Sequence, residues 1–283
     1  MPSPPTASIV IPTRDRADYL DVALSSVVAQ AIAAGAEVLV VSDGPDPRTE
    51  AIARRHGVRM IALPGPSGAN AARNAGVGAT AGDPIVFIDD DVDAPAGWLD
   101  ALLDGVREAP AYGVFGGPIT ARLEGGGPRA CGREPAPITT LDLGPSDRDA
   151  ELVWSANMAV RRGAFEAAGP FDEQCTGHGD EEEWERRYVA AGGRVRYLAG
   201  ATLEHCRHRA DATVAALARA DYRHGQSARR NDVRIGAAPS LRGELRTLAG
   251  CAWHILRRRC AIGIVLFAHT AGRLREALGE LRS

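Results

Sequence analysis

Residues 84–91 read Pro-Ile-Val-Phe-Ile-Asp-Asp-Asp, an apolar run that ends abruptly in three carboxylates. A continuous apolar run of this kind is typical of a strand that is buried on both faces of a sheet. Similar runs precede it at residues 8–11, 37–42 and 59–63, and helical stretches separate them near residues 17–33, 48–56 and 70–79. The alternation predicts an α/β fold with a mostly parallel central sheet.

The pattern is less regular beyond this stretch. Residues 116–149 are rich in Gly and Pro and predict long loops. Strand-like character returns at residues 152–160, a helix is expected over 181–191, and short extended segments follow at 195–198 and 202–205. From residue 211 onward the chain is expected to be helical, with a pair of apolar helical stretches separated near residues 257–259.

The composition is that of a globular protein. The 283 residues are 45% hydrophobic and 24% charged, which excludes a disordered chain, a fibrous repeat and a small disulfide-built domain. The net charge is only −3, so we expect no nucleic-acid partner. Residues 206–283 contain 15 Arg and 6 acidic side chains, which predicts an acidic body followed by a basic tail region.

Cysteine usage and the chain start bear on localisation. The five cysteines are widely spaced and form no Cys-x-x-Cys pair, so reduced thiols and a cytoplasmic location are expected. The first residues lack the basic and apolar regions of a signal peptide. The most apolar run, residues 261–268, is far shorter than the ~20 residues that span a bilayer.

Polar residues that follow the strands are the candidate ligands, because open α/β sheets bind ligands outside the carboxyl ends of their strands. They are Thr13, Asp15, Asp43 and the triplet Asp89–Asp91. Adjacent carboxylates repel one another unless a cation or solvent screens them, and Mg²⁺ takes oxygen ligands. The triplet is therefore interpreted as a metal site rather than as a solvated acidic turn.

Three later features each allow a structural and a functional interpretation. Arg73 lies in a Gly-flanked helix entry that suits a phosphate, although an Arg on a helix is usually just solvated. Asp180 and Glu181 begin a helix, where carboxylates are stabilised by the helix dipole but can also serve as a general base. His205 ends a short strand, and its imidazole is either structural or a ligand for an ion such as Mn²⁺.

The order and spacing of these features resemble a family 2 glycosyltransferase of the GT-A fold, with a likeness that covers roughly residues 6–208. The matching pieces are Ile9-Val-Ile-Pro-Thr-Arg-Asp-Arg16, Val40-Val-Ser-Asp-Gly44, Gly68 to Gly76, Phe87-Ile-Asp-Asp-Asp91, Trp154-Ser-Ala-Asn-Met-Ala-Val-Arg-Arg162, Gly179 to Arg187, and His205. The resemblance implies an inverting, metal-dependent enzyme that moves a hexosyl or N-acetylhexosaminyl group from a nucleotide diphosphate donor, preferably a UDP-sugar.

The resemblance also implies roles for individual residues. Thr13 and Asp43 fall where such enzymes hold the base and ribose, with Asp43 facing the base, and Arg73 falls where they contact the diphosphate. Asp15 is a further donor-binding candidate. Asp89, Asp90 and Asp91 match the D-x-D motif, in which Asp89 lies near the ribose and Asp91 binds Mg²⁺ or Mn²⁺. His205 matches a metal-ligand His of some relatives.

The family usually has Glu-Asp where this chain has Asp180-Glu181. We take Glu181 as the base, with Asp180 as its neighbour and Glu182 in reserve. Alternative functions are a retaining transferase or a nucleotidyltransferase on the same scaffold and, more distantly, a non-catalytic module that binds nucleotide sugars.

Two domains are expected. Residues 1–208 form the catalytic domain, with a donor half over 1–115 and an acceptor half over 116–208, and residues 209–283 form an Arg-rich helical region. The tail helices are expected to pack on the catalytic body or on another subunit. The other interpretation is an interfacial helix at the inner face of an anionic membrane, which would suit a lipid-linked acceptor. The expected acceptor is a saccharide, a lipid-linked molecule or a small molecule.

Overall fold

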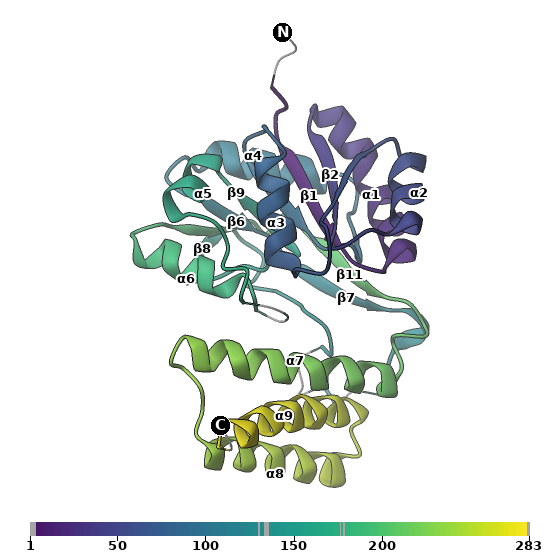
Figure 1. The fold of residues 1–283 in the computed structure, drawn as a ribbon, viewed down its shortest axis with the longest axis vertical. Coiled ribbons are helices and arrows are strands. Elements are labelled where there is room, and N and C mark those ends of the chain that lie inside the picture. Colours follow the sequence, from purple (N-terminus) through teal and green to yellow (C-terminus); the bar gives the residue numbers. More distant parts are fainter. Residues whose placement is uncertain (1–3, 130, 133–135, 176, 178, 282–283) are drawn as a thin grey trace. The chain divides into compact units, whose positions relative to one another are not determined.

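The computed structural model describes residues 4–129, 131–132, 136–175, 177 and 179–281 (Figure 1). They form two compact units. The first comprises Met1–Thr120, Thr140–Cys175 and Glu181–His205, and the second comprises Ala121–Thr139, Thr176–Asp180 and Cys206–Ser283. The expected domains at 1–208 and 209–283 stay predictions. Residues 1–3, part of the segment expected to lack a signal peptide, and residues 130 and 133–135 of the expected loop region lie outside the described residues.

An eight-stranded sheet with the order β3-β2-β1-β4-β9-β6-β10-β8 is the centre of the first unit. Its strands are β1 (Ser8–Thr13), β2 (Glu37–Ser42), β3 (Arg59–Ala62), β4 (Ile85–Ile88), β6 (Val114–Gly116), β8 (Arg148–Ala150), β9 (Asn157–Val160) and β10 (Val195–Tyr197). The four strands expected to be parallel are parallel neighbours. Strand β9 is antiparallel to β4 and β6, and β10 is parallel to β6. The α/β class is therefore confirmed, with a mixed second half.

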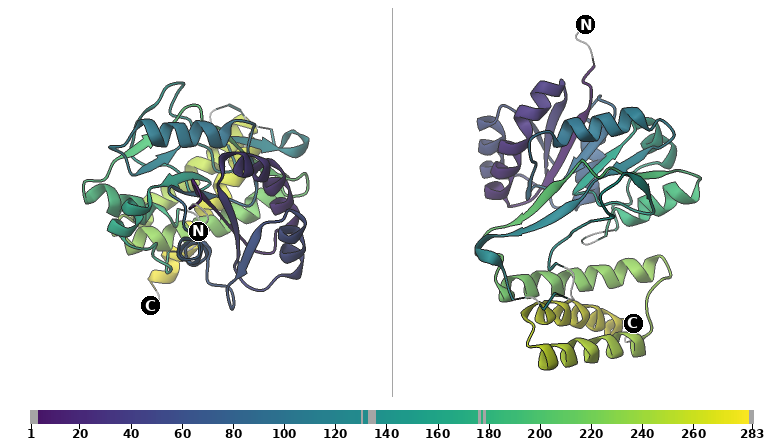
Figure 2. Two further views of the ribbon diagram at one scale, coloured as in Figure 1. Left: turned by 90° about the horizontal axis from the view of Figure 1, so that it is seen from above. Right: turned by 180° about the vertical axis from the view of Figure 1, so that it is seen from behind.

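Both faces of the sheet are covered, which explains the continuous apolar runs. On β1, Ile9 and Ile11 belong to one core cluster and Val10 to the other. The first cluster is covered by α1 (Ala17–Ala34), α2 (Pro47–Arg55) and α4 (Trp98–Glu108), and the second by α3 (Ala69–Gly78), α5 (Arg162–Ala168) and α6 (Glu182–Ala190). Figure 1 shows α3 over one face, and the reverse view in Figure 2 shows α4 over the other.

Helix α1 is the one helix among the described residues with the length and apolar composition of a membrane span. Leu20, Leu24 and Val27 on this helix are fully buried in the core of the first unit. Each buried side chain of this size contributes about 1.5–3 kcal/mol to folding. The apolar character of α1 is thus accounted for by packing against the sheet.

A smaller sheet with the order β5-β11-β7 contains β5 (Val92–Asp93), β11 (Leu203–Arg207) and β7 (Ile119–Leu123). Strand β11 confirms the extended segment expected at 202–205. Strands β7 and β8, and the short 3-10 helix Glu124–Gly126, lie where the sequence predicted only loops, so that prediction was wrong in part. The apolar signal is weak there because the middle of β7, from Thr120 to Arg122, is exposed.

Three helices form most of the second unit: α7 (Val214–Arg234), α8 (Leu241–Arg258) and α9 (Ala261–Glu280). The expected pair corresponds to α8 and α9, which lie on either side of Arg259, and α7 confirms the helical character expected from residue 211 onward. Helices α7 and α9 cross at glycines, because a Cβ atom on Gly272 would lie only 2.0 Å from the carbonyl oxygen of Tyr222. The described residues give no support to membrane contact through these helices.

Candidate active site

The three aspartates follow β4 directly, at its carboxyl end. Asp90 and Asp91 are 4% and 2% exposed, and Asp89 is partly buried, so the triplet is not a solvated turn. Thr13 at the end of β1 donates its hydroxyl hydrogen to Asp90 Oδ2 over 2.7 Å. Arg16 donates from Nη1 to Asp90 Oδ1 over 2.8 Å and from Nη2 to Asp91 Oδ2.

His205 reaches the triplet through strand pairing. Strand β5 begins immediately after Asp91, and its residue Val92 pairs with His205 on β11. This register places His205 Nε2 2.9 Å from Asp91 Oδ1, and His205 is 3% exposed. Donor atoms of Asp89, Asp91 and His205 all lie within 4.8 Å of one another. Two carboxylates and an imidazole at this spacing are a donor set that fits Mn²⁺ and similar divalent cations.

Negative charge is in excess around the triplet. Burial and the neighbouring Asp91 raise the pKa of Asp89, and the opposing influences of Arg73 and His205 do not cancel them. Burial also raises the pKa of Asp90, although Arg16 acts in the other direction. Since desolvation disfavours the charged form of a carboxyl group, a bound cation would favour full ionisation here.

Arg73 and Glu181 are connected through Ser155. The Arg73 guanidinium, on α3, donates from Nη1 to Asn70 Oδ1 over 2.7 Å and from Nη2 to Ser155 Oγ over 2.8 Å. Ser155 in turn donates its backbone N–H and its hydroxyl to Glu181 Oε1, over 3.1 and 3.2 Å. Arg73, Ser155 and Glu181 are all at least nine-tenths buried. The carboxylate of Glu181 is therefore held in place by hydrogen bonds.

The three acidic candidates at the start of α6 differ in their surroundings. Glu181 precedes the helix and is buried in the first unit. Glu182 accepts a hydrogen bond from Arg186 Nε over 2.9 Å, one turn along the exposed side of the helix. Asp180 is buried as well and belongs to the second compact unit. Within the first unit, the sequence-predicted site residues thus include Glu181 but not Asp180.

Asp43 and Asp15 have different environments. Asp43, which follows β2, is buried and accepts hydrogen bonds from the backbone N–H groups of Ser67 and Gly68 at the entry to α3. Asp15 has a side chain that is 82% exposed, 3.7 Å from Arg14 Nε. Across the described part of the chain, no hydrogen bond or ion pair of Asp15 reaches the aspartate triplet, so the structure does not gather it with the other candidates.

Sequence reasoning missed the site roles of Arg16, Ser155 and Asn70. Arg16 follows the carboxyl end of β1, and that position was the signal that would have identified it. Ser155 lies in the Trp154-Ser-Ala-Asn segment just before β9. Its link to Arg73 joins residues 82 positions apart in the sequence, so only the folded chain reveals it.

Comparisons with known proteins find similarity to glycosyltransferases. The sequence profile of the family described as "Glycosyl transferase family 2" matches residues 8–169. The chain is 31% identical over 216 residues to the "Pre-mycofactocin glycosyltransferase" of Mycobacterium tuberculosis, covering 72% of this chain and 43% of that protein. It is 28% identical over 196 residues to "Glycosyltransferase AglE" of Haloferax volcanii, covering 66% of this chain and 62% of that protein. This chain thus matches less than half of the mycobacterial relative's length.

A solved structure shares the fold. The structure described as "Crystal structure of GalNAc-T7 with UDP, GalNAc and Mn2+" superposes with a TM-score of 0.56 at 14% identity, over 80% of this chain and 48% of that one. At this identity the likeness concerns the fold alone.

Proposed function

The chain belongs to glycosyl transferase family 2, and on this premise we propose that it transfers a sugar from a nucleotide diphosphate donor to an acceptor hydroxyl with inversion. The observation that carries the proposal is the convergence of Asp89, Asp91 and His205 within 4.8 Å at the carboxyl end of β4. That edge is where ligands bind in open α/β sheets. Glycosyltransferase chemistry needs charge stabilisation on the leaving diphosphate, and this edge supplies candidates for it.

Asp89, Asp91 and His205 would hold Mg²⁺ or Mn²⁺. The bound ion would neutralise negative charge on the diphosphate as a Lewis acid. Arg16 fixes the orientation of Asp90 and Asp91 by donating to both carboxylates. Arg73 presents a second positive charge, which suits contact with diphosphate oxygens, and its orientation is set by Asn70 and Ser155.

Glu181 is proposed as the general base. Its carboxylate would take the proton from the acceptor hydroxyl while that oxygen attacks the anomeric carbon opposite the leaving group. The two hydrogen bonds from Ser155 favour the ionised form, which is the form that accepts a proton. A single displacement of this kind inverts the anomeric configuration.

Donor recognition is assigned to the ends of β1 and β2. Asp43 holds the entry to α3 through Ser67 and Gly68, and it is proposed to face the base and ribose. Thr13 supports Asp90 by its hydrogen bond. A uridine nucleotide is proposed because the solved neighbour is described with UDP and Mn²⁺. Asp15 is the proposed donor contact that the geometry supports least.

A binding panel followed by product analysis tests this function. The full chain is mixed with nucleoside diphosphates and nucleotide sugars, with and without Mn²⁺, and its melting temperature is measured. Uridine ligands with Mn²⁺ should raise it most, because a ligand of the native state stabilises that state. Release of pyrophosphate instead of a nucleoside diphosphate would indicate a nucleotidyltransferase. NMR showing retention of the anomeric configuration would exclude inversion, and binding without turnover would indicate a non-catalytic module.

The base assignment is tested by a matched pair of substitutions. Glu181→Gln should lower kcat by about 100-fold or more, in line with the usual contribution of general base catalysis, and should leave donor affinity unchanged. Glu182→Gln changes the adjacent residue, whose carboxylate pairs with Arg186, and should keep near-normal turnover. Equal losses in both variants, or full activity of Glu181→Gln, would overturn the assignment.

A further inference from the structure

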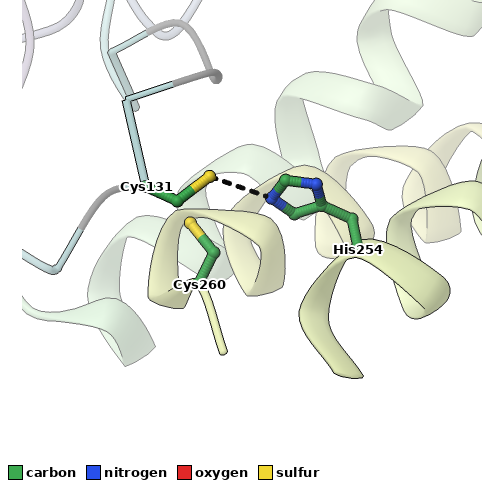
Figure 3. A group of neighbouring side chains, drawn as sticks. All are labelled: Cys131, His254 and Cys260. Carbon is green, nitrogen blue, oxygen red and sulfur yellow. Dashed lines mark hydrogen bonds between the residues drawn. The ribbon is translucent and has the colours of Figure 1, made fainter. Parts of the chain in front are cut away.

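Two cysteines and a histidine converge in the second compact unit, independently of the residues discussed above. Cys131 lies in the segment Ala121–Thr139, His254 lies near the end of α8, and Cys260 precedes the first residue of α9. One donor atom from each lies within 4.8 Å of the other two. Figure 3 shows the Cys131 sulfur directed at the imidazole of His254, with the Cys260 sulfur beside it.

The spacing matches a tetrahedral zinc site. Zinc binds sulfur at about 2.3 Å and imidazole nitrogen at about 2.0–2.1 Å, so tetrahedral angles place the ligand atoms roughly 3.6–3.8 Å apart. The distance from Cys131 Sγ to His254 Nε2 is 3.6 Å. The other two pairs of donor atoms are at most 4.8 Å apart, so they reach the same spacing by movements of at most about 1.2 Å.

The backbone holds these side chains together. Ala261 N donates to the carbonyl oxygen of Arg129 over 3.0 Å, which ties the Cys131 segment to the start of α9. Arg259 adopts a left-handed conformation (φ 50°) and reverses the chain between α8 and α9. This reversal brings Cys260 back beside His254, and Cys260 is only 2% exposed. The cluster is therefore a consequence of the fold of this unit.

The donor types indicate which metal would bind. Two thiolates and one imidazole suit zinc, whereas Mg²⁺ and Mn²⁺ prefer oxygen ligands. Two thiolates carry a charge of −2, which a Zn²⁺ ion balances. The Asp89, Asp91 and His205 group has the harder donors, so the two groups differ in the metal each would select.

We propose that Cys131, His254 and Cys260 form a zinc site, with a fourth position taken by water or by another ligand. Both thiols lose their protons as the two zinc–sulfur bonds form, and no electron transfer is involved. The ion links the Ala121–Thr139 segment to the turn between α8 and α9. Because the linked residues are more than a hundred positions apart, the site restricts the unfolded chain strongly and stabilises this unit.

Metal analysis of the full chain, purified without a histidine tag, tests the site. The chain is stripped with chelator, reloaded with Zn²⁺ and dialysed, and bound zinc is measured by mass spectrometry. About one zinc ion per chain is expected to remain. Replacement by Co²⁺ should give the visible absorption of a tetrahedral site together with sulfur-to-metal charge transfer, a signature that carboxylate ligands do not produce.

Matched variants locate the ion. Cys131 is exposed, so Cys131→Ser is expected to fold normally. It should weaken zinc affinity by at least about 100-fold, because losing a direct ligand costs more affinity than losing a residue that only supports a ligand. Cys251→Ser alters a cysteine on α8 outside the proposed site, whose sulfur lies 3.8 Å from Thr270 Oγ1, and should retain the metal. Asp91→Asn should also retain the thiolate absorption.

Three results would overturn the proposal. The first is absence of the charge-transfer band in the Co²⁺-loaded wild-type chain. The second is loss of zinc in Cys251→Ser equal to that in Cys131→Ser. The third is a Cys131–Cys260 disulfide in freshly purified protein, detected by mass spectrometry without reduction, because a disulfide would leave no thiolates for the metal. In the native chain, chelator should instead increase the rate at which an alkylating reagent modifies Cys131.

Discussion

Removal of the Ser155 hydroxyl is the sharpest probe of the hydrogen-bonded link between Arg73 and Glu181. Ser155→Ala deletes the 3.2 Å hydrogen bond from Oγ to Glu181 Oε1 and the 2.8 Å hydrogen bond that Oγ accepts from Arg73. The backbone N–H of residue 155 still donates to Glu181 over 3.1 Å. The carboxylate therefore loses one of the two hydrogen bonds that Ser155 provides.

The size of the effect follows from these contacts. A hydrogen bond to a charged group contributes about 1.5–3 kcal/mol, and about 1.4 kcal/mol corresponds to one pKa unit. If Glu181 is the base, the acidic limb of kcat against pH should move upward by about 1–2 pH units in Ser155→Ala. Near the acidic limb, kcat should fall about 10-fold to 100-fold, and the KM for the donor should change less.

The assay is release of nucleoside diphosphate from the donor across pH, paired with thermal unfolding. Ser8→Ala is the control, since Ser8 is also buried, donates to Glu37 Oε1 over 2.7 Å and accepts from Gly82 N over 2.7 Å, at the opposite end of β1. It should lose stability without moving the pH profile. An unshifted acidic limb in Ser155→Ala, with a stability loss like that of the control, would refute both the positioning role of Ser155 and the assignment of Glu181.

Two further predictions concern stability. Burial raises the pKa of Glu185 well above its ordinary value of 4.5, so its favourable contribution is complete below pH 4.5 and is lost as pH rises through the higher pKa of the folded state. Glu185→Gln should therefore narrow the difference in melting temperature between pH 5 and pH 8; an unchanged difference would contradict this. Gly272→Ala should destabilise the chain by about 1–3 kcal/mol in denaturant unfolding, because the new Cβ would lie 2.0 Å from the Tyr222 carbonyl oxygen. Gly279→Ala on the same helix, where a Cβ meets nothing within 4 Å, should be neutral or stabilising, and similar losses at both positions would show that close packing is not the cause.

The first ninety residues were predictable because β1, β2 and β4 are mostly buried apolar runs and Gly or Pro lies at one or both ends of each helix. The helix expected at 17–33 is Ala17–Ala34, and the strand expected at 37–42 is Glu37–Ser42. The direction of β9 was not predictable, since a strand buried on both faces has the same apolar pattern whether it runs parallel or antiparallel. Strand β9, antiparallel to β4 and β6, and the edge strand β8, antiparallel to β10, make the sheet mixed.

The candidate site was only partly predictable, for a related reason. Asp89–Asp91 and Glu181 could be found because carboxylates at a strand end or helix entrance are a local signal. Ser155 gives no such signal, because a serine before a strand is common and its partners are distant in sequence. The convergence of Cys131 with His254 and Cys260 was hidden in the same way, since 123 residues separate Cys131 from His254. Wide cysteine spacing predicted only reduced thiols. A zinc site is compatible with that prediction, because thiolates bound to a metal are not oxidised.

The buried charges give the strongest reason to link the triplet with its proposed donor. Asp90 accepts hydrogen bonds from Arg16 and Thr13, yet burial still raises its pKa. Asp91 shares Arg16 and faces His205, while Asp89 remains close to Asp91 and Glu181. Ionising all of these carboxylates in a buried setting is unfavourable unless positive charge is added. A divalent cation would lower that cost, and by linkage the same cation would bind more tightly once the carboxylates are ionised. Metal affinity should therefore rise with pH. An affinity that does not change with pH would show that the aspartate triplet does not bind the metal.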